Sequence, residues 1–381
     1  GPVYLDCAAT APLDPRVRDV LLRHLEPDFG NAGSRTHEFG RRARAAVEQG
    51  RQQVATVVAA SRGEVIFTSG ATESNNLAIA GLEAHGRDTG KLHVVTTSIE
   101  HHAVLGPLEA LENRGFEVTR IAPEPSGRVN ARAVYDAVRA DTLLISVMHV
   151  NNETGIRQPV EAIADLLADH PAYFHVDAAQ SFGKEVEALQ HQRIDLISVS
   201  GHKIHGPQGV GGLIARRRGR TRPPLKPLLH GGGQEFGFRS GTLPVPLIAA
   251  FGAAAEFALA ESAERRKICL VFRQRLLLGL APLSPVINGS LAHASPHIVN
   301  LSIPDMDAET VMEAWHDAVA VSNGAACSSQ LYTCSHVLSA MRLPEERMAG
   351  ALRLSWSHLT PEPDWAGMVQ AILQVKSLAA V

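Results

Sequence analysis

Short apolar runs alternate with longer stretches of helical periodicity over the first two thirds of the chain. The apolar runs predict strands at 65–68, 92–96, 118–121, 143–148, 173–176, 196–199 and 212–215. Between several of them, the periodicity predicts helices at 74–81, 104–113, 131–140 and 160–168. Strands that alternate with helices favour an α/β fold, in which helices cover both faces of a mostly parallel sheet.

The pattern changes after about Leu247, where a long helical stretch rich in Ala, Glu and Arg runs to about Leu280. A shorter strand-and-helix unit follows it to the end of the chain. We therefore predict a large domain at 15–255 and a smaller α+β domain made of 1–14 and 256–381. Ligands of open α/β sheets bind beyond the carboxyl ends of the strands, so the residues that follow each strand are the first candidates for chemistry.

Composition narrows the class of protein. The 381 residues are 45% hydrophobic and 20% charged, as in an ordinary globular protein, and the formal charge of −3 gives no basic field for direct nucleic-acid binding. We interpret the arginine-rich segment 216–222 as a solvated surface turn. We find no apolar run that would span a membrane and no signal peptide. Four cysteines make no disulfide scaffold and favour a reducing cytoplasm.

Among the six lysines, Lys203 stands out because it directly follows a predicted strand, in the segment Ser-Gly-His-Lys at 200–203. An amine at that edge of the sheet could form a Schiff base with an aldehyde cofactor. A loop lysine paired with a carboxylate is the alternative. The other five lysines are expected on the solvated surface, and they are Lys91, Lys184, Lys226, Lys267 and Lys376.

Four more strand ends carry polar groups. Asp177 could keep a pyridine nitrogen protonated, and the segment 69–74 at a helix start could bind an anion. His101 could stack on a cofactor ring and move protons, and Asn152 could donate to an oxygen. Each has an ordinary structural alternative, such as a helix cap. Together with Lys203, however, they indicate a site for pyridoxal phosphate (PLP).

A cysteine near the end of the chain adds a candidate nucleophile. Cys327 lies in a run of Gly, Ala, Ser and Asn at 322–330, which reads as an exposed loop thiol. Cys334 is a possible second thiol, although its surroundings fit the start of a helix. Cys7 and Cys269 are expected to be packing residues. A Schiff-base cofactor and a loop thiol together suggest covalent sulfur chemistry.

Four segments resemble the signatures of cysteine desulfurases, at 68–76, 175–180, 200–203 and 239–242. These enzymes, similar to the IscS and NifS group, are fold-type I PLP enzymes, and the resemblance runs from Tyr4 to Arg353. It implies an aspartate aminotransferase-like large domain and a homodimer.

The resemblance also implies a role for each site residue. Lys203 would hold PLP, Asp177 would pair with its pyridine nitrogen, and His101 would stack on the ring as acid and base. Cys327 would take the sulfur of L-cysteine as a persulfide, releasing alanine, and Arg353 would bind the substrate carboxylate. The phosphate would be held by Ala71, Thr72, Ser200, His202 and, from the other subunit, Thr242. Gln180 and Asn152 would contact the phenolic oxygen or the substrate.

Three segments depart from the family pattern, at Cys7 and Ala11, at Ala32, and at 332–334 after Cys327. The departure at 332–334 could change the choice of the sulfur acceptor. The acceptor is a protein that the sequence does not identify. The chain also resembles the desulfurase of bacterial DNA phosphorothioation, so iron–sulfur assembly and DNA modification are both expected destinations of the sulfur.

Other classes of protein fit the sequence less well. A PLP lyase or aminotransferase would use Lys203 and Asp177 without the thiol. A zinc hydrolase would use His175, Asp177, His202 and His205, but the usual spacing of metal ligands is missing, and we expect no metal. A serine hydrolase would need a Gly-x-Ser-x-Gly segment, which the sequence lacks. A scaffold protein without catalysis would bind no PLP.

Overall fold

A computed structural model describes residues 1–324 and 334–379. Its main sheet contains every strand that the apolar runs predict, each within one residue of the expected ends. These strands are β2 (Val65–Thr68), β3 (His93–Thr97), β4 (Glu117–Ile121), β5 (Thr142–Met148), β6 (Tyr173–Asp177), β7 (Leu196–Ser200) and β8 (Gly211–Ala215).

The sheet is mostly parallel, as predicted. Its strand order is β2-β8-β7-β6-β5-β3-β4, and only β8 runs antiparallel to its neighbours. The carboxyl ends of the six other strands therefore meet at one edge of the sheet. The turn from β7 back to β8 starts at this edge, and it carries Lys203.

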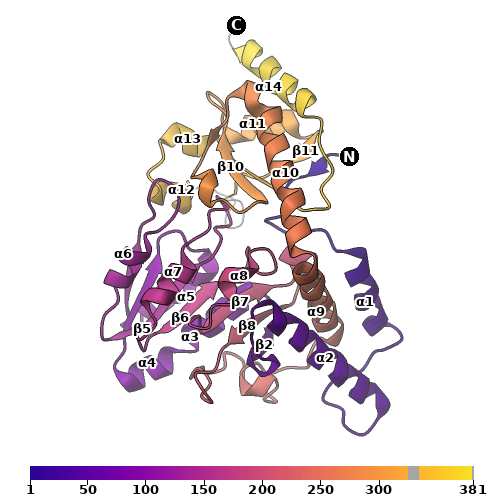
Figure 1. The fold of residues 1–381 in the computed structure, drawn as a ribbon, viewed down its shortest axis with the longest axis vertical. Helices are drawn as coiled ribbons and strands as arrows, with labels where there is room; N and C mark the ends of the chain where they lie inside the picture. The colour runs from indigo at the N-terminus through magenta and orange to yellow at the C-terminus, as the bar shows by residue number, and fades with distance from the viewer. Residues whose placement is uncertain (325–333, 380–381) are drawn as a thin grey trace.

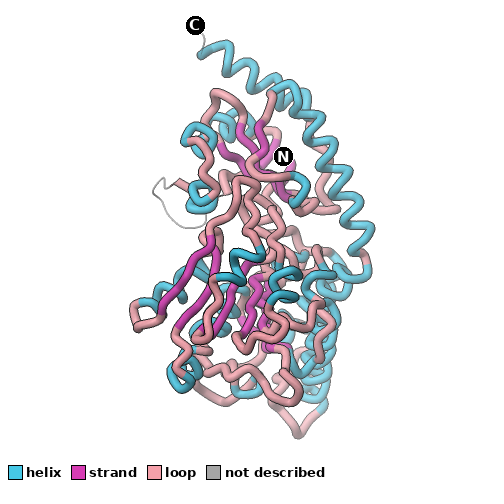
Figure 2. The backbone as a smooth tube through the Cα atoms, turned by 60° about the vertical axis from the view of Figure 1, so that its left-hand side comes forward, coloured by secondary structure: helices cyan, strands magenta, loops and turns pink. Residues whose placement is uncertain are grey.

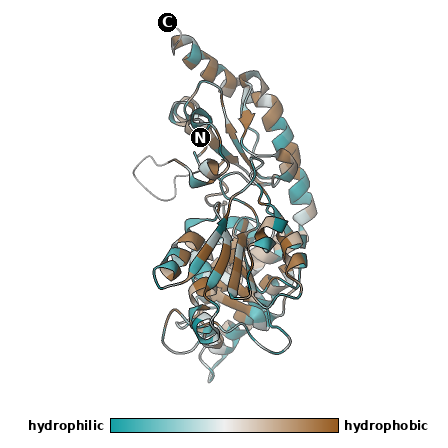
Figure 3. Cartoon of the chain, turned by 90° about the vertical axis from the view of Figure 1, so that its left-hand side faces the viewer, coloured by the Kyte–Doolittle hydropathy of each residue, from teal (hydrophilic) through white to brown (hydrophobic). Residues whose placement is uncertain are grey.

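Helices cover both faces of the sheet. Consecutive residues of β2 show this, because Ile66 packs into one hydrophobic cluster and Phe67 into another. In Figure 3 the strands of this sheet are coloured mostly as hydrophobic residues. The covering helices are α1 (Pro15–Leu25), α2 (Glu38–Val57), α3 (Ala71–Ala80), α4 (Glu83–Thr89), α5 (His102–Glu112), α6 (Ala131–Asp136), α7 (Val160–Leu166), α8 (Val186–Leu189) and α9 (Val245–Ala260).

The long helical stretch expected before Leu280 is two helices, α9 and α10 (Ser262–Leu280), with a bend of 73° between them. Glu261 lies at the break, where Arg16 of α1 donates to its carboxylate at 2.6 Å and Arg265 at 2.7 Å. In the described part of the chain no single helix is long and apolar enough to cross a membrane. Among the described residues, only the bent pair of α9 and α10 together has the length and composition of a membrane span.

A second hydrophobic core lies above the main sheet, and α10 connects the two (Figure 1). It brings Leu5, near the start of the chain, together with Trp315 and Trp356. Figure 2 shows its short strands apart from those of the main sheet. The domain boundaries at 15–255 and 256–381 stay a prediction.

Small sheets and short helices make up the rest of the fold. Antiparallel strands β12, β10 and β9 form one sheet, and β1 pairs in parallel with β11 in another. The strands are β1 (Val3–Tyr4), β9 (Val286–Ile287), β10 (Ile298–Ser302), β11 (Val319–Ala320) and β12 (Ala351–Ser355). The helices are α11 (Ala308–Trp315), α12 (His336–Ala340), α13 (Glu345–Ala349) and α14 (Trp365–Ala379). Short 3₁₀ turns are η1 (Arg62–Glu64), η2 (His202–Ile204), η3 (Glu235–Gly237), η4 (Ala281–Leu283) and η5 (Leu291–His293).

A histidine in the middle of the main sheet makes folding sensitive to acid. His175 of β6 is fully buried, its Nδ1 lies 2.7 Å from Oγ of Ser146, and its Nε2 lies 2.8 Å from Oγ of Ser198. Burial lowers the pKa of His175 to about 3. The folded state thus holds this ring neutral, whereas the unfolded chain protonates it below about pH 6.5.

We expect His175 to reduce the free energy of unfolding as the pH falls below 6.5, by about 1.4 kcal/mol per unit. Urea unfolding of the wild type and of His175→Gln at several pH values measures this. The variant should show a shallower loss between pH 6 and 4. His316→Gln, which alters an exposed ring, is the control. Equal slopes for His175→Gln and the wild type would refute the expectation.

Candidate active site

A cavity of about 480 Å³ opens at the carboxyl ends of the central strands. It brings together ten of the predicted site residues, which are Ala71, Thr72, His101, Asn152, Asp177, Gln180, Ser200, His202, Lys203 and Arg353. Thr242 is exposed and lies outside this lining. Cys327 lies outside the described residues.

Lys203 lies in η2, directly after β7. Its Nζ donates to the carbonyl oxygen of Ala9 at 2.9 Å and to that of Ala8. The segment at 8–9, near the start of the chain, therefore faces the lysine across the cavity. Ala8 also lines the cavity, and no motif in the sequence points to this position.

Asp177 ends β6 with its carboxylate fixed on both oxygens. Oδ2 accepts from Nδ2 of Asn75 at 3.0 Å, and Oδ1 accepts from the backbone N–H of Ala179 at 3.0 Å. Both of these donors are neutral, so they orient the carboxylate without cancelling its charge. A carboxylate held in this way suits the protonated ring nitrogen of PLP. Asn75 belongs to a signature segment, but sequence reasoning gave it no role.

The turn from β2 into α3 forms a cradle for an anion. Ala71 and Thr72 are the first residues of α3, so their backbone N–H groups lie in the turn that has no helical acceptors. Glu73 stiffens this turn, because it accepts from the backbone N–H of Ser69 at 2.7 Å and from Nε of Arg239 at 2.7 Å. Ser200 lines the cavity as well, which adds a hydroxyl to the cradle.

Two histidines of the cavity are held neutral. Nδ1 of His101 accepts from the backbone N–H of Ala103 at 3.0 Å, so the proton of the neutral ring is on Nε2. Burial, with the charge of Lys203, lowers the pKa of His101. Nδ1 of His202 lies 3.0 Å from Oγ1 of Thr10, and burial lowers the pKa of His202 to about 4. Neither ring therefore carries a positive charge at pH 7.

Arg353 of β12 connects the two cores at the cavity. Its Nη2 lies 2.7 Å from Oδ1 of Asp6, and its Nη1 donates to the carbonyl oxygen of Asn152 at 3.0 Å. The side chain is buried, and its Nε has no hydrogen-bond partner in the described part of the chain. A buried guanidinium with an unused donor is suited to a substrate carboxylate. Sequence reasoning missed Asp6, which is 347 residues away.

The prediction for Lys184 was wrong, because this residue was expected on the solvated surface. The structure places it half-buried, close to Cys7 and Cys269, and burial lowers its pKa to about 8. Cys7 and Cys269 are buried, as expected of packing residues. The reason for the difference is that packing around the turn after β6 encloses Lys184, and polar neighbours in the sequence do not reveal this.

Of the four residues that a zinc hydrolase would use, only Asp177 and His202 line the candidate cavity. His175 contacts Ser146 and Ser198, whereas His205 contacts the carbonyl oxygen of Pro12. Within residues 1–324 and 334–379, no three His, Cys, Asp or Glu side chains form a group that could hold a metal ion. These contacts argue against a zinc hydrolase.

Known proteins are similar to this chain over most of its length. Residues 3–359 match the family model for class-V aminotransferases. The cysteine desulfurase IscS of Vibrio cholerae is 43% identical over 366 residues, which cover 95% of this chain and 90% of the relative.

Two solved structures are also similar. The crystal structure of DndA from Streptomyces lividans superposes with a TM-score of 0.82 at 50% identity, covering 93% of this chain and 99% of the other. The structure of SspA in complex with cysteine superposes with a TM-score of 0.82 at 35% identity, covering 94% and 100%. The chain therefore belongs to the class-V aminotransferases and, within them, is a PLP-dependent cysteine desulfurase.

Proposed function

We propose that the protein converts L-cysteine to L-alanine and passes the sulfur, as a persulfide on Cys327, to an acceptor protein. The observation that carries this proposal is the convergence of Lys203, Asp177, His101 and Arg353 on one cavity. The cysteine in the SspA complex supports the choice of substrate.

The chain's own groups fit the parts of the cofactor. Lys203 supplies the amine that would hold it covalently, and Asp177 would hold its ring nitrogen protonated. The cradle of Ala71, Thr72, Ser200 and His202 would bind the phosphate. The buried Oε1 of Gln180 has no protein partner among the described residues, so it can accept from a polar group of cofactor or substrate. When bound, PLP stabilises negative charge on the substrate carbon atoms.

The remaining residues would position the substrate and move its protons. Arg353 would bind the carboxylate through its guanidinium, held in place by Asp6 and by the carbonyl oxygen of Asn152. His101 would hold a proton on Nε2, because its Nδ1 is occupied by Ala103. Protons could therefore move between substrate and protein at this one atom.

Sulfur transfer needs a nucleophile as well. The thiolate of Cys327 would attack Sγ of the substrate, forming an S–S bond as the C–S bond breaks. The electron pair of the broken bond stays on carbon and takes up a proton, so alanine leaves and a persulfide remains. Transfer to an acceptor thiol would then restore Cys327.

We also propose a cytoplasmic homodimer in which Thr242 of one subunit reaches the phosphate of the other. The exposure of Thr242 on a segment tied to the cradle by the Arg239–Glu73 ion pair supports this arrangement. The greater identity to DndA, 50% against 43% to the IscS relative, supports DNA modification over iron–sulfur assembly as the destination of the sulfur.

Cys327→Ser tests the thiol step. We expect the variant to keep the yellow colour of bound PLP but to lose production of both alanine and sulfide from cysteine with a reductant. Cys269→Ser, which alters a buried thiol, is the control and should retain activity. Continued alanine release by Cys327→Ser would instead favour a PLP lyase or aminotransferase. A colourless wild type would favour a scaffold.

A further inference from the structure

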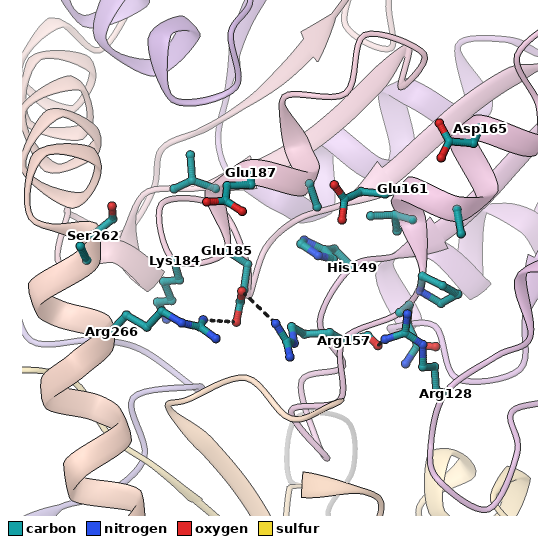
Figure 4. A pocket seen from close by; sticks show the side chains of 17 residues that line it. Arg128, His149, Arg157, Glu161, Asp165, Lys184, Glu185, Glu187, Ser262 and Arg266 are labelled. Atoms are coloured by element: carbon teal, nitrogen blue, oxygen red, sulfur yellow. Dashed lines mark hydrogen bonds and ion pairs between the residues drawn. The ribbon is translucent and has the colours of Figure 1, made fainter. Parts of the chain in front are cut away.

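A second cavity, of about 940 Å³, lies next to the end of β5, on the side of the segment 148–150 that faces away from the cofactor cavity. Met148 and Val150 line the cofactor cavity, whereas His149 between them lines this one, as expected for alternating side chains of an extended chain. The other walls come from the segments 157–165 and 184–188 and from the start of α10 (Figure 4). This volume suits an organic ligand of moderate size.

Four basic side chains line this cavity, and they are Arg128, Arg157, Lys184 and Arg266. All four are half-buried. Glu185 pairs with Arg266 at 3.0 Å and lies 3.6 Å from Arg157, as the dashed lines in Figure 4 show. One partly buried carboxylate thus serves two guanidinium groups.

Arg128 has no carboxylate partner in the described part of the chain. Its Nη1 donates to the carbonyl oxygen of Arg157 at 3.0 Å and lies 3.4 Å from Nδ1 of His293. Burial and the charge of Arg157 lower the pKa of Arg128. The three other carboxylates of the lining are exposed at the rim, where water screens their charge, and they are Glu161, Asp165 and Glu187.

His149 adds an independent sign of a ligand. Its side chain is 3% exposed, and its Nδ1 is buried with no hydrogen-bond partner in the part of the chain that the structure describes. Buried polar atoms are almost always hydrogen-bonded, so this one calls for an occupant. The ring lies among the lining side chains in Figure 4. Burial lowers the pKa of His149 to about 3, so the neutral ring can donate one N–H to an anion.

We propose that this cavity binds a small organic oxyanion with two or more negative charges, a phosphate ester or a polycarboxylate, through Arg128, Arg157 and His149. Guanidinium groups match both kinds of oxyanion with paired hydrogen bonds. The site is separate from that of cysteine, and the proposal does not depend on the desulfurase reaction. The proposed site is next to the cofactor cavity. The backbone N–H of His149 donates to the carbonyl oxygen of Asp177 at 3.0 Å, which connects the two cavities.

Calorimetric titration of the PLP-loaded protein tests this, with inorganic phosphate and citrate as separate probes at constant ionic strength. We expect saturable binding of at least one probe. Binding of phosphate alone would assign the site to phosphate esters, and binding of citrate alone to polycarboxylates. Arg128→Gln and Arg157→Gln should each weaken binding about tenfold or more, because each removes charged donors.

Arg132→Gln is the matched control, since Arg132 is exposed and pairs with Asp136 outside the cavity. It should bind like the wild type, and desulfurase activity should confirm that every variant is folded. Absence of saturable binding by both probes through the millimolar range would overturn the proposal. So would unchanged affinity in both Arg128→Gln and Arg157→Gln.

Discussion

Replacing Lys203 with alanine is expected to abolish alanine production from cysteine, with a loss of at least roughly 10³-fold. Lys203 provides the amine of the cavity that faces the carbonyl oxygens of Ala8 and Ala9. Without it PLP has no covalent attachment, so dialysis should remove the cofactor more readily. Product assays and the absorbance of bound PLP before and after dialysis measure both effects.

Lys226→Ala is the matched control for this prediction, since Lys226 is an exposed lysine outside the cavity. It should retain the activity and the colour of the wild type. Lys203→Ala should unfold with the same cooperativity as the wild type, which separates lost chemistry from lost folding. Near-normal turnover in a folded Lys203→Ala protein would contradict the assigned role.

Replacing Glu235 with alanine is expected to lower the free energy of unfolding by about 3–5 kcal/mol, because the change breaks a buried ion pair and leaves Arg51 with only the partly exposed carboxylate of Glu48. The carboxylate of Glu235 accepts from Nη1 and Nη2 of Arg51 at 2.7 and 2.8 Å. It also accepts from the backbone N–H of Phe67 at 2.7 Å, which ties the segment before Thr242 to β2. Arg51 and Glu235 are both almost fully buried.

Urea unfolding of single and double variants measures this effect. Arg51→Met combined with Glu235→Leu removes both charges, so the double variant should be more stable than Glu235→Ala. Asp136→Ala, which breaks an exposed ion pair with Arg132, should change stability by less than about 1 kcal/mol. A loss as small as this in Glu235→Ala would refute the prediction.

The sequence was a good guide to the main sheet because both faces of its strands are buried. Strands such as 65–68 and 143–148 are therefore continuous apolar runs with clear ends. The clustering of polar side chains at the strand ends was also predictable, since the carboxyl ends of parallel strands meet at one edge. Lys203, Asp177 and His101 were found in this way, and the cavity contains all three.

Contacts between distant segments could not be predicted from the sequence. Asp6 orients Arg353 and Asn75 orients Asp177, but neither contact leaves a local pattern, because the partners belong to different elements. Arg16 from another helix pairs with Glu261 at the break between α9 and α10, a contact that leaves no signal in the helical periodicity. The burial of Lys184 likewise depends on what packs around its turn.

The pairing of the first residues with β12 has a consequence for synthesis on the ribosome. The backbone N–H of Ser355 donates to the carbonyl oxygen of Leu5, and Asp6 holds Arg353. The main sheet can form as its strands emerge, but Leu5, Asp6 and Cys7 cannot complete their contacts until β12 has left the exit tunnel. A growing chain must therefore keep these residues from other contacts until β12 has been made, and a nascent chain halted before β12 would hold the main sheet with an open, incomplete substrate site.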